Sequence, residues 1–229
     1  MPYAHALALQ REVNLAVAQG NQPPTLLLVE HDPVITITHR PNAWDNLLAP
    51  QSRLDELGIK IELTDRGGDI TYHGPGQLVA YPILRMNPLG LNLSSYMRLL
   101  EQIIIDLLAG YGIEGQREPG ATGVWVDVSG FGQSGAANAQ ITNAESRLAK
   151  VCAMGVRVRK NTTMHGLALN VTTDLSHFTT IDPCGLGGRP VTSLAELMGD
   201  AVPTMDQVKQ ALIDQMIRSL NARRAGADS

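Results

Sequence analysis

Strand-like and helical segments follow one another irregularly along this chain of 229 residues. Short runs of β-branched and other apolar residues predict strands at 25–30, 34–38, 60–64, 69–73, 77–84, 123–126, 147–158 and 164–171. Longer segments with a recurring apolar face predict helices at 4–18, 52–57, 94–112 and from 204 onward. Because strands and helices do not alternate strictly, we expect an α+β fold in which helices flank a mixed β-sheet.

Short connections suggest which strands are neighbours. The runs at 25–30 and 34–38 are separated by little more than a His-Asp-Pro sequence and look like adjacent strands. Gly74-Pro75-Gly76 predicts a tight turn between the strands at 69–73 and 77–84.

Two helices carry capping signals. Ser94 or Ser95 is suited to cap the helix over 94–112. Thr204 and Gln207 have the spacing of a capping box, which predicts the start of the last helix.

The composition is that of a globular protein with one substantial core. Hydrophobic residues make up 44% of the chain and charged residues 17%, and no long polar linker divides it. We therefore expect a single domain over residues 1–222 and a frayed tail at 223–229. The segment 127–146 is rich in Gly, Ser, Ala and Asn, which predicts an inserted loop between two strands.

Charge and cysteine content exclude several classes of protein. The net charge is −4 and no basic stripe is present, so a nucleic-acid partner is not expected. Two cysteines are too few for a disulfide framework, and no spacing typical of a metal site occurs. No apolar run approaches the roughly 20 residues that span a bilayer, and the first residues do not form a secretion signal. We expect a cytoplasmic protein that uses no metal and no cofactor.

The stretch RGGDITYHGPGQL at 66–78 concentrates glycines around Thr71, Tyr72 and His73. Glycine permits positive φ angles and the close approach of a ligand to the main chain. The stretch at 66–78 matches neither the phosphate-binding P-loop nor the dinucleotide-binding glycine pattern. Two interpretations remain from the residues alone: a glycine-kinked hairpin with a structural Tyr and His, or a backbone wall against which a ligand lies.

Cys184 and Lys150 are candidates for thiol chemistry. Cys184 lies among prolines and glycines, which favours a loop, although an inert buried cysteine is an equal alternative. Lys150 lies within an apolar strand, where alternation predicts that it shares one face with Cys152 and Met154. It is either an edge-strand lysine that discourages aggregation or a cation or base that activates a thiol. His165 with Asn170 suggests a thiol-protease triad only weakly, because no local signature matches.

Five segments occur together in an order that identifies the chain as similar to a known family. They are RGGDITYHGPGQLVAYPIL (66–84), GVWV (123–126), LAKVCAMGVRVR (148–159), MHGLALNV (164–171) and PCG (183–185). The chain resembles the lipoyl(octanoyl) transferases from about residue 25 to 200. The resemblance implies the biotin/lipoate protein ligase fold.

The resemblance also implies a reaction and its partners. A cysteine thioester would carry an octanoyl group from octanoyl-acyl carrier protein to a lysine of a lipoyl domain, the first step of endogenous protein lipoylation. Acceptors would be the lipoyl domains of 2-oxo-acid dehydrogenase complexes and the glycine-cleavage H protein. Thioester exchange followed by amide formation needs no ATP, in agreement with the absence of a P-loop.

By position, the resemblance makes Cys184 the nucleophile and Lys150 the residue that lowers its pKa. The acyl site would then be formed by three segments: Arg66, Gly67, Gly68, Asp69, Ile70, Thr71, Tyr72 and His73; Ala153, Met154 and Gly155; and Gly166, Leu167 and Ala168. Val79, Tyr81, Met154 and Leu167 would line an apolar slot for the acyl tail. Main-chain amides of Gly67, Gly68 or Gly185 are suited to bind an oxyanion.

Some features depart from the family pattern and keep other functions open. Cys152 stands where alanine is more usual, so a second thiol is expected near the site. The alternatives are an ATP-dependent lipoate or biotin ligase, a lipoyl amidotransferase that uses H protein as donor, and a non-catalytic lipoyl-domain-binding module. The ligase is disfavoured because its GRGRxGR-like string is missing.

Overall fold

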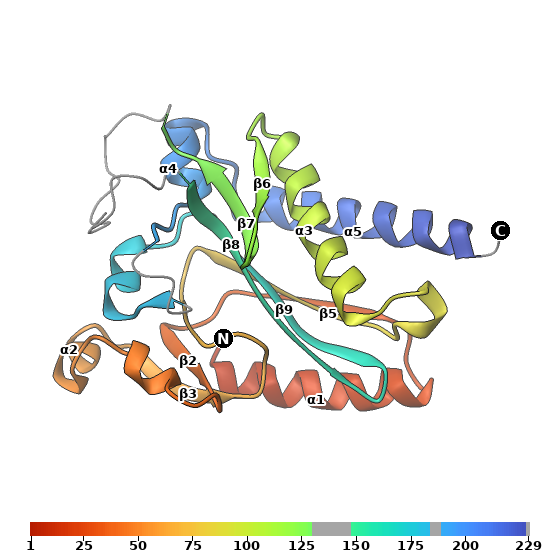
Figure 1. Ribbon diagram of the computed structural model, residues 1–229, viewed down its shortest axis with the longest axis horizontal. Coiled ribbons are helices and arrows are strands. Elements are labelled where there is room, and N and C mark those ends of the chain that lie inside the picture. The colour runs from red at the N-terminus through yellow and green to blue at the C-terminus, as the bar shows by residue number, and fades with distance from the viewer. Residues whose placement is uncertain (130–147, 184–188, 228–229) are drawn as a thin grey trace.

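The computed structural model describes residues 1–129, 148–183 and 189–227, and the side chains only as far as residue 224. Two sheets organise these residues (Figure 1). The larger sheet has the strand order β1-β5-β9-β8-β7-β6 and every neighbouring pair in it is antiparallel. The smaller sheet has the order β3-β2-β4, in which β2 pairs with β3 in parallel and with β4 antiparallel.

The α+β class is confirmed, but the mixed pairing is confined to the small sheet. The large sheet contains β1 (Thr25–Val29), β5 (Gln77–Ile83), β6 (Gly115–Glu118), β7 (Ala121–Asp127), β8 (Leu148–Arg159) and β9 (Thr162–Asn170). The small sheet contains β2 (Val34–Thr38), β3 (Lys60–Thr64) and β4 (Ile70–His73). The polar strand β6 carries no apolar run and was not expected.

The prediction that the strands at 25–30 and 34–38 are neighbours was wrong. Strand β1 pairs with β5 and β2 pairs with β4, so the His-Asp-Pro connection leads from one sheet to the other. The predicted tight turn at 74–76 is confirmed, since the Gln77 amide donates to the Gly74 carbonyl at 3.2 Å. It leads from β4 in the small sheet to β5 in the large one, so these two strands do not form a hairpin. Sequence proximity favours adjacent strands only as a tendency, and here each connection leads from one sheet to the other.

Helices cover both faces of the large sheet. Helix α3 (Leu93–Ala109) and helix α5 (Met205–Ala227) pack on one face, in the main core with Leu78, Ala80 and Leu169. Helix α1 (Tyr3–Gln19) lies on the other face, where Ala6 packs against Val79, Tyr81 and Ala168. Alternating residues of β5 therefore face the two layers, as the pleat of a strand requires.

Short helices complete the chain between these elements. They are α2 (Gln51–Glu56), α4 (Leu194–Met198) and the 3₁₀ segments Ala43–Asn46, Asn87–Leu89, Leu175–Thr180 and Gly199–Ala201. No helix in the described ranges is both long and apolar enough to cross a bilayer.

Two cap predictions had different outcomes. The Thr204–Gln207 capping box is confirmed, since each side chain accepts from the other residue's backbone amide, at 3.3 and 2.8 Å. Helix α3, however, begins after Asn92, whose side chain accepts from the Ser95 amide, while Ser95 accepts from the Asn92 amide. Ser95 is thus the N3 partner of the capping box and not the cap itself.

The ends of two predicted segments differ from the structure or lie outside it. Helix α5 continues to Ala227, so residues 223–227 are helical where we expected a frayed tail. Of the predicted inserted loop at 127–146, only residues 127–129 lie within the described ranges. The proposed single domain over 1–222 stays a prediction.

Candidate active site

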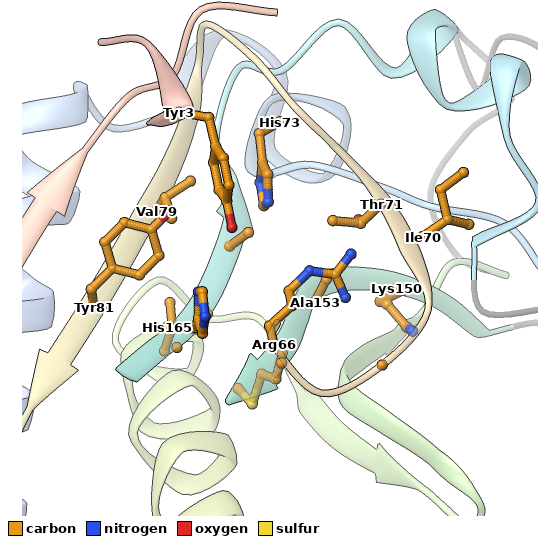
Figure 2. Close-up of a pocket in the computed structure, with 16 residues that line it drawn as sticks. Tyr3, Arg66, Ile70, Thr71, His73, Val79, Tyr81, Lys150, Ala153 and His165 are labelled. Atoms are coloured by element: carbon orange, nitrogen blue, oxygen red, sulfur yellow. The ribbon is translucent and has the colours of Figure 1, made fainter. Parts of the chain in front are cut away.

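A cavity opens between the large sheet and the loop that joins β3 to β4 (Figure 2). The space within it, counting the solvent at its open mouth, is about 520 Å³. The lining residues come from α1, from the 66–73 segment and from three neighbouring strands: Tyr3, Arg66, Gly68, Ile70, Thr71, His73, Val79, Tyr81, Lys150, Ala153, Met154, Gly155, His165, Gly166, Leu167 and Ala168.

The floor of the cavity is made of very small residues on β8 and β9. Ala153 lies opposite Ala168, and Gly155 lies opposite Gly166. A Cβ atom on Gly166 would lie 2.1 Å from the carbonyl oxygen of Ala80 on β5. Only glycine fits that position, because its missing side chain makes room for the Ala80 carbonyl and the Pro82 ring of β5.

The roof is the loop at Arg66–Asp69, and Arg66 holds it in shape. Its guanidinium donates to the Thr36 carbonyl at 2.9 Å, to the Gly67 carbonyl at 3.0 Å and to the Asp69 carbonyl at 3.2 Å. The amide of Gly67 donates to the Val156 carbonyl of β8 at 2.9 Å. A Cβ atom on Gly155 would lie 2.4 Å from the Gly67 carbonyl oxygen, so glycine permits this close contact between loop and sheet.

Lys150 lies at one end of the cavity and is 7% exposed. Its ammonium nitrogen is 4.7 Å from the centre of the Trp125 ring, a cation–π contact. Its backbone pairs with the segment 190–192, because Lys150 N donates to the Pro190 carbonyl and Thr192 N donates to the Lys150 carbonyl, both at 2.9 Å. The strand that carries Lys150 is therefore joined to the chain a few residues after Cys184.

Cys184 lies outside the described residues, but the chain before it is anchored near the same cavity. The amide of Asp182 donates to the Asn46 carbonyl at 2.8 Å, and the Asn46 side chain donates to Asp69 at 2.8 Å. Two residues of chain span at most about 7 Å. Asp182, two residues before Cys184 in the sequence, is thus linked through Asn46 to the roof loop.

Polar rings line the opposite end of the cavity. Tyr3 is hydrogen-bonded to Thr64 at 2.7 Å, and its ring stacks on that of His73. Burial, and next the neighbouring His31, lowers the pKa of His73 to about 3, so its ring is neutral. The ring donates to Gln77 Oε1 at 2.7 Å, which completes its hydrogen bonding on that nitrogen.

His165 occupies an unusual backbone position in the same wall. Its φ is +57° and its amide donates to the side chain of Gln10 on α1 at 2.8 Å. Its Nε2 donates to Asp65 at 2.8 Å, and Asp65 also pairs with Arg157 at 2.5 Å. Burial lowers the pKa of His165, against the opposing effect of Asp65.

A family profile described as "Lipoyl protein ligase A/B catalytic domain" matches residues 2–217, almost the whole chain. The chain belongs to this family. It is 40% identical over 206 residues to an octanoyltransferase of Geobacter metallireducens, which covers 90% of this chain and 84% of that protein. It is 41% identical over 226 residues to an octanoyltransferase of Chloroflexus aggregans, which covers 98% of this chain and 93% of that protein.

Solved structures of similar fold include lipoate protein ligases. A bi-partite lipoate protein ligase of Thermoplasma acidophilum superposes with a TM-score of 0.69 over 96% of this chain and 81% of that one, at 17% identity. Lipoate-protein ligase A bound with ATP gives a TM-score of 0.67 over 91% and 78%, at 16% identity. At these identities the likeness confirms the expected lipoate/biotin ligase fold and nothing further.

Most of the residues predicted for the acyl site of this lipoyl protein ligase A/B family member line the one cavity. Three do not. The Asp69 side chain accepts from Asn46, and Gly67 is engaged with β8. Tyr72 is buried in the separate core of the small sheet and its hydroxyl is 2.7 Å from His177.

The predicted apolar slot is also divided between two faces of the sheet. Val79 and Tyr81 belong to the cluster under α1, on the side of the cavity. Met154 and Leu167 border the cavity, yet both pack in the main core on the opposite face. Tyr3 was missed altogether, since no motif marks a residue so far away in sequence.

The prediction that Cys152 shares a face with Lys150 was wrong. Trp125 pairs with Lys150 and Val124 with Cys152, so β8 has one residue more than β7 at this point. Such a bulge reverses the alternation of side chains beyond it. Cys152 is 0% exposed in the main core, and burial raises the pKa of its thiol.

Among the described residues, no three His, Cys, Asp or Glu side chains are grouped as a metal site.

Proposed function

We propose that this protein is an octanoyltransferase that uses Cys184 as a transient carrier of the octanoyl group. The donor is octanoyl-acyl carrier protein and the acceptor is a lysine of a lipoyl domain. Relatives about 40% identical over most of their length bear the name octanoyltransferase. The observation that carries the proposal is the buried Lys150 at the end of the cavity, joined by its backbone to the segment that follows Cys184.

The first half-reaction exchanges one thioester for another. The Cys184 thiolate attacks the thioester carbonyl carbon, a new C–S bond forms, and the bond to the phosphopantetheine sulfur breaks. That sulfur leaves as a thiolate and takes up a proton. Only the thiolate is nucleophilic, and a neighbouring cation increases its population at neutral pH. We assign this role to Lys150.

The second half-reaction forms an amide. The neutral amine of the acceptor lysine attacks the octanoyl-Cys184 carbonyl, the C–N bond forms, and the C–S bond breaks. The amine nitrogen loses one proton to solvent, and the Cys184 thiolate is regenerated beside Lys150. Thioester cleavage by an amine runs downhill, so no nucleotide is consumed.

The oxyanion of each tetrahedral intermediate needs donors. The Gly67 amide is already committed to the Val156 carbonyl, which removes it from the candidates. The amides of Gly68 and Gly185 remain as the proposed donors.

Intact-mass measurement after mixing with octanoyl-acyl carrier protein tests the proposal. We expect an octanoyl adduct on the wild type and on Cys152→Ser, no adduct on Cys184→Ser, and discharge of the adduct by a lipoyl domain. Cys152→Ser is the matched control because its thiol is buried in the core. An adduct that disappears only with Cys152→Ser would overturn the assignment of Cys184.

The alternatives differ in their acyl donor. An ATP-dependent ligase would modify the lipoyl domain from free octanoate and ATP, and an amidotransferase would require octanoylated H protein. A non-catalytic binding module would form no adduct. We expect product only with octanoyl-acyl carrier protein.

A further inference from the structure

The cavity is a slot with two distinct ends. Figure 2 shows Lys150 at one side and Tyr3, Tyr81 and His165 at the other. The slot runs along the strands, since Lys150 and Gly155 are the first and last cavity residues of β8. At about 3.3 Å per residue the five intervening steps amount to on the order of 15 Å.

Nothing larger than a methyl group rises from the middle of the floor. Ala153 and Ala168 form one cross-strand pair there, and Gly155 and Gly166 form the pair nearer the far end. The roof loop comes down onto this second pair, since Gly155 lies directly under the Gly67 carbonyl and the Arg66 side chain. Beyond it the cavity is bounded by Tyr81 of β5 and Tyr3 of α1, which both line it.

Tyr3 and Tyr81 close the far end, and both are buried, at 4% and 3% exposure. The Tyr81 hydroxyl is 2.7 Å from His31 Nε2, and His31 Nδ1 donates to the Met1 carbonyl at 3.0 Å. The Tyr3 hydroxyl is 2.7 Å from Thr64. Rotating either ring out of the way would leave buried polar partners without a hydrogen bond, so the wall resists displacement.

Helix α1 continues the closure behind the two rings. Ala6 packs on Tyr81 and Ala168, and Gln10 accepts from the His165 amide. The face of the sheet that forms the floor is thus covered by α1 from Tyr3 onward. A chain too long for the slot has no path along the floor beyond this point.

We propose that the paired rings of Tyr3 and Tyr81 set the maximum length of the acyl chain that the cavity accepts. The proposal rests on the proposed function, which supplies the acyl substrate. Each methylene that reaches apolar wall improves binding by about fourfold. Transfer efficiency therefore rises with chain length until the chain meets the rings, and then falls.

Chain-length profiles of ring variants test this. Acyl carrier protein loaded with 6-, 8-, 10- or 12-carbon chains is assayed with the wild type, Tyr3→Ala, Tyr81→Ala, Tyr3→Phe and Tyr81→Phe. We expect the alanine variants to raise kcat/KM for the 12-carbon chain, relative to the 8-carbon chain, by at least about tenfold. Because the phenylalanine variants keep the rings, we expect them to keep the wild-type dependence of kcat/KM on chain length. Alanine variants that remain active with an unchanged profile would overturn the proposal.

A binding measurement separates this proposal from the proposed function. Calorimetric titration of the full chain with octanoate and dodecanoate needs no transfer and no nucleophile. A shift of preference toward dodecanoate in Tyr3→Ala supports the wall even if the wild type transfers no acyl group, in which case only the proposed function fails. If wild type and both alanine variants are folded by circular dichroism and show the same preference, the proposal that Tyr3 and Tyr81 limit the chain length is refuted.

Discussion

The amide of Thr192 donates to the carbonyl of Lys150 at 2.9 Å, across a sequence separation that includes Cys184. This bond and its companion from Lys150 N to the Pro190 carbonyl join the lysine strand to the chain that follows the cysteine. A side chain on a central strand is held more rigidly than one on a loop. The arrangement therefore gives the proposed cation a fixed position.

Replacing Lys150 by Met should slow octanoyl loading of the enzyme by about 100-fold or more, because the thiolate loses its neighbouring charge. The pH dependence of alkylation of the Cys184 thiol by iodoacetamide measures the cause, and its midpoint should move upward. Lys60→Met, at an exposed position of β3, is the matched control and should leave the loading rate and the alkylation midpoint unchanged. An unaltered alkylation midpoint in Lys150→Met would contradict the cation role.

Stability should fall as the pH is lowered below about 6.5, partly because of His73. The pKa of His73 is about 3 in the folded protein because its ring is buried, against about 6.5 in the unfolded chain. Between these two pH values the unfolded state binds a proton that the folded state lacks. His73 therefore lowers the free energy of unfolding by about 1.4 kcal/mol for each unit by which the pH falls. Burial lowers the pKa of His31 and His165 as well, which adds in the same direction.

Urea denaturation between pH 7.5 and 5.0 measures this slope. His73→Gln should flatten it by about 1.4 kcal/mol per pH unit. His5→Gln, at an exposed position of α1, is the control and should keep the wild-type slope. Equal slopes for wild type and His73→Gln would show that His73 is protonated in the folded protein.

Asp65→Ala should lower the free energy of unfolding by about 1–3 kcal/mol, because it leaves the buried Nε2–H of His165 without an acceptor. Arg157→Ala removes the other partner of Asp65, but the arginine side chain is 43% exposed. Arg157→Ala should therefore lower the free energy of unfolding by less than about 1 kcal/mol. Denaturant titration measures the free energy of unfolding of both variants. An equal loss in Asp65→Ala and Arg157→Ala would mean that the ion pair with Arg157, and not the hydrogen bond to His165, is what Asp65 contributes to stability.

Gly166→Ala should destabilise the protein by about 3 kcal/mol, since the new methyl group would lie 2.1 Å from the Ala80 carbonyl oxygen. Gly110→Ala provides a comparison at a position with helical backbone, φ −61°, and should change stability by less than about 1 kcal/mol. Thermal and urea unfolding of the two variants give the difference. If Gly166→Ala were as stable as the control, the close approach of β5 and β9 would not require glycine.

The helices and most strands were predictable because each depends on a local pattern. The apolar stripe of Val208, Leu212, Met216 and Leu220 faces the core as its spacing requires, and the strand at 147–158 coincides closely with β8. Strand β6 was not predictable, because its residues Gly-Gln-Arg-Glu carry no β signal and pair only in the context of β7.

The candidate site was predictable where a contiguous motif carries it. The 66–73 segment supplies Arg66, Gly68, Thr71 and His73 to the cavity. Tyr3 could not be found in this way, because it reaches the cavity only through the packing of α1 on the sheet. The assignments of Cys184 as nucleophile and Lys150 as its activating cation stay predictions.

The amino-acid sequence by itself determined the local elements, the glycine-rich roof and the family resemblance, since each is written in neighbouring residues. The tertiary structure alone decided which strands pair and which face each side chain takes. One additional residue in β8 separates Lys150 in the cavity from Cys152 in the core, although simple alternation would put them together. The physical reason is that strand register has a period of two, so a shift of a single residue exchanges the two faces of a sheet.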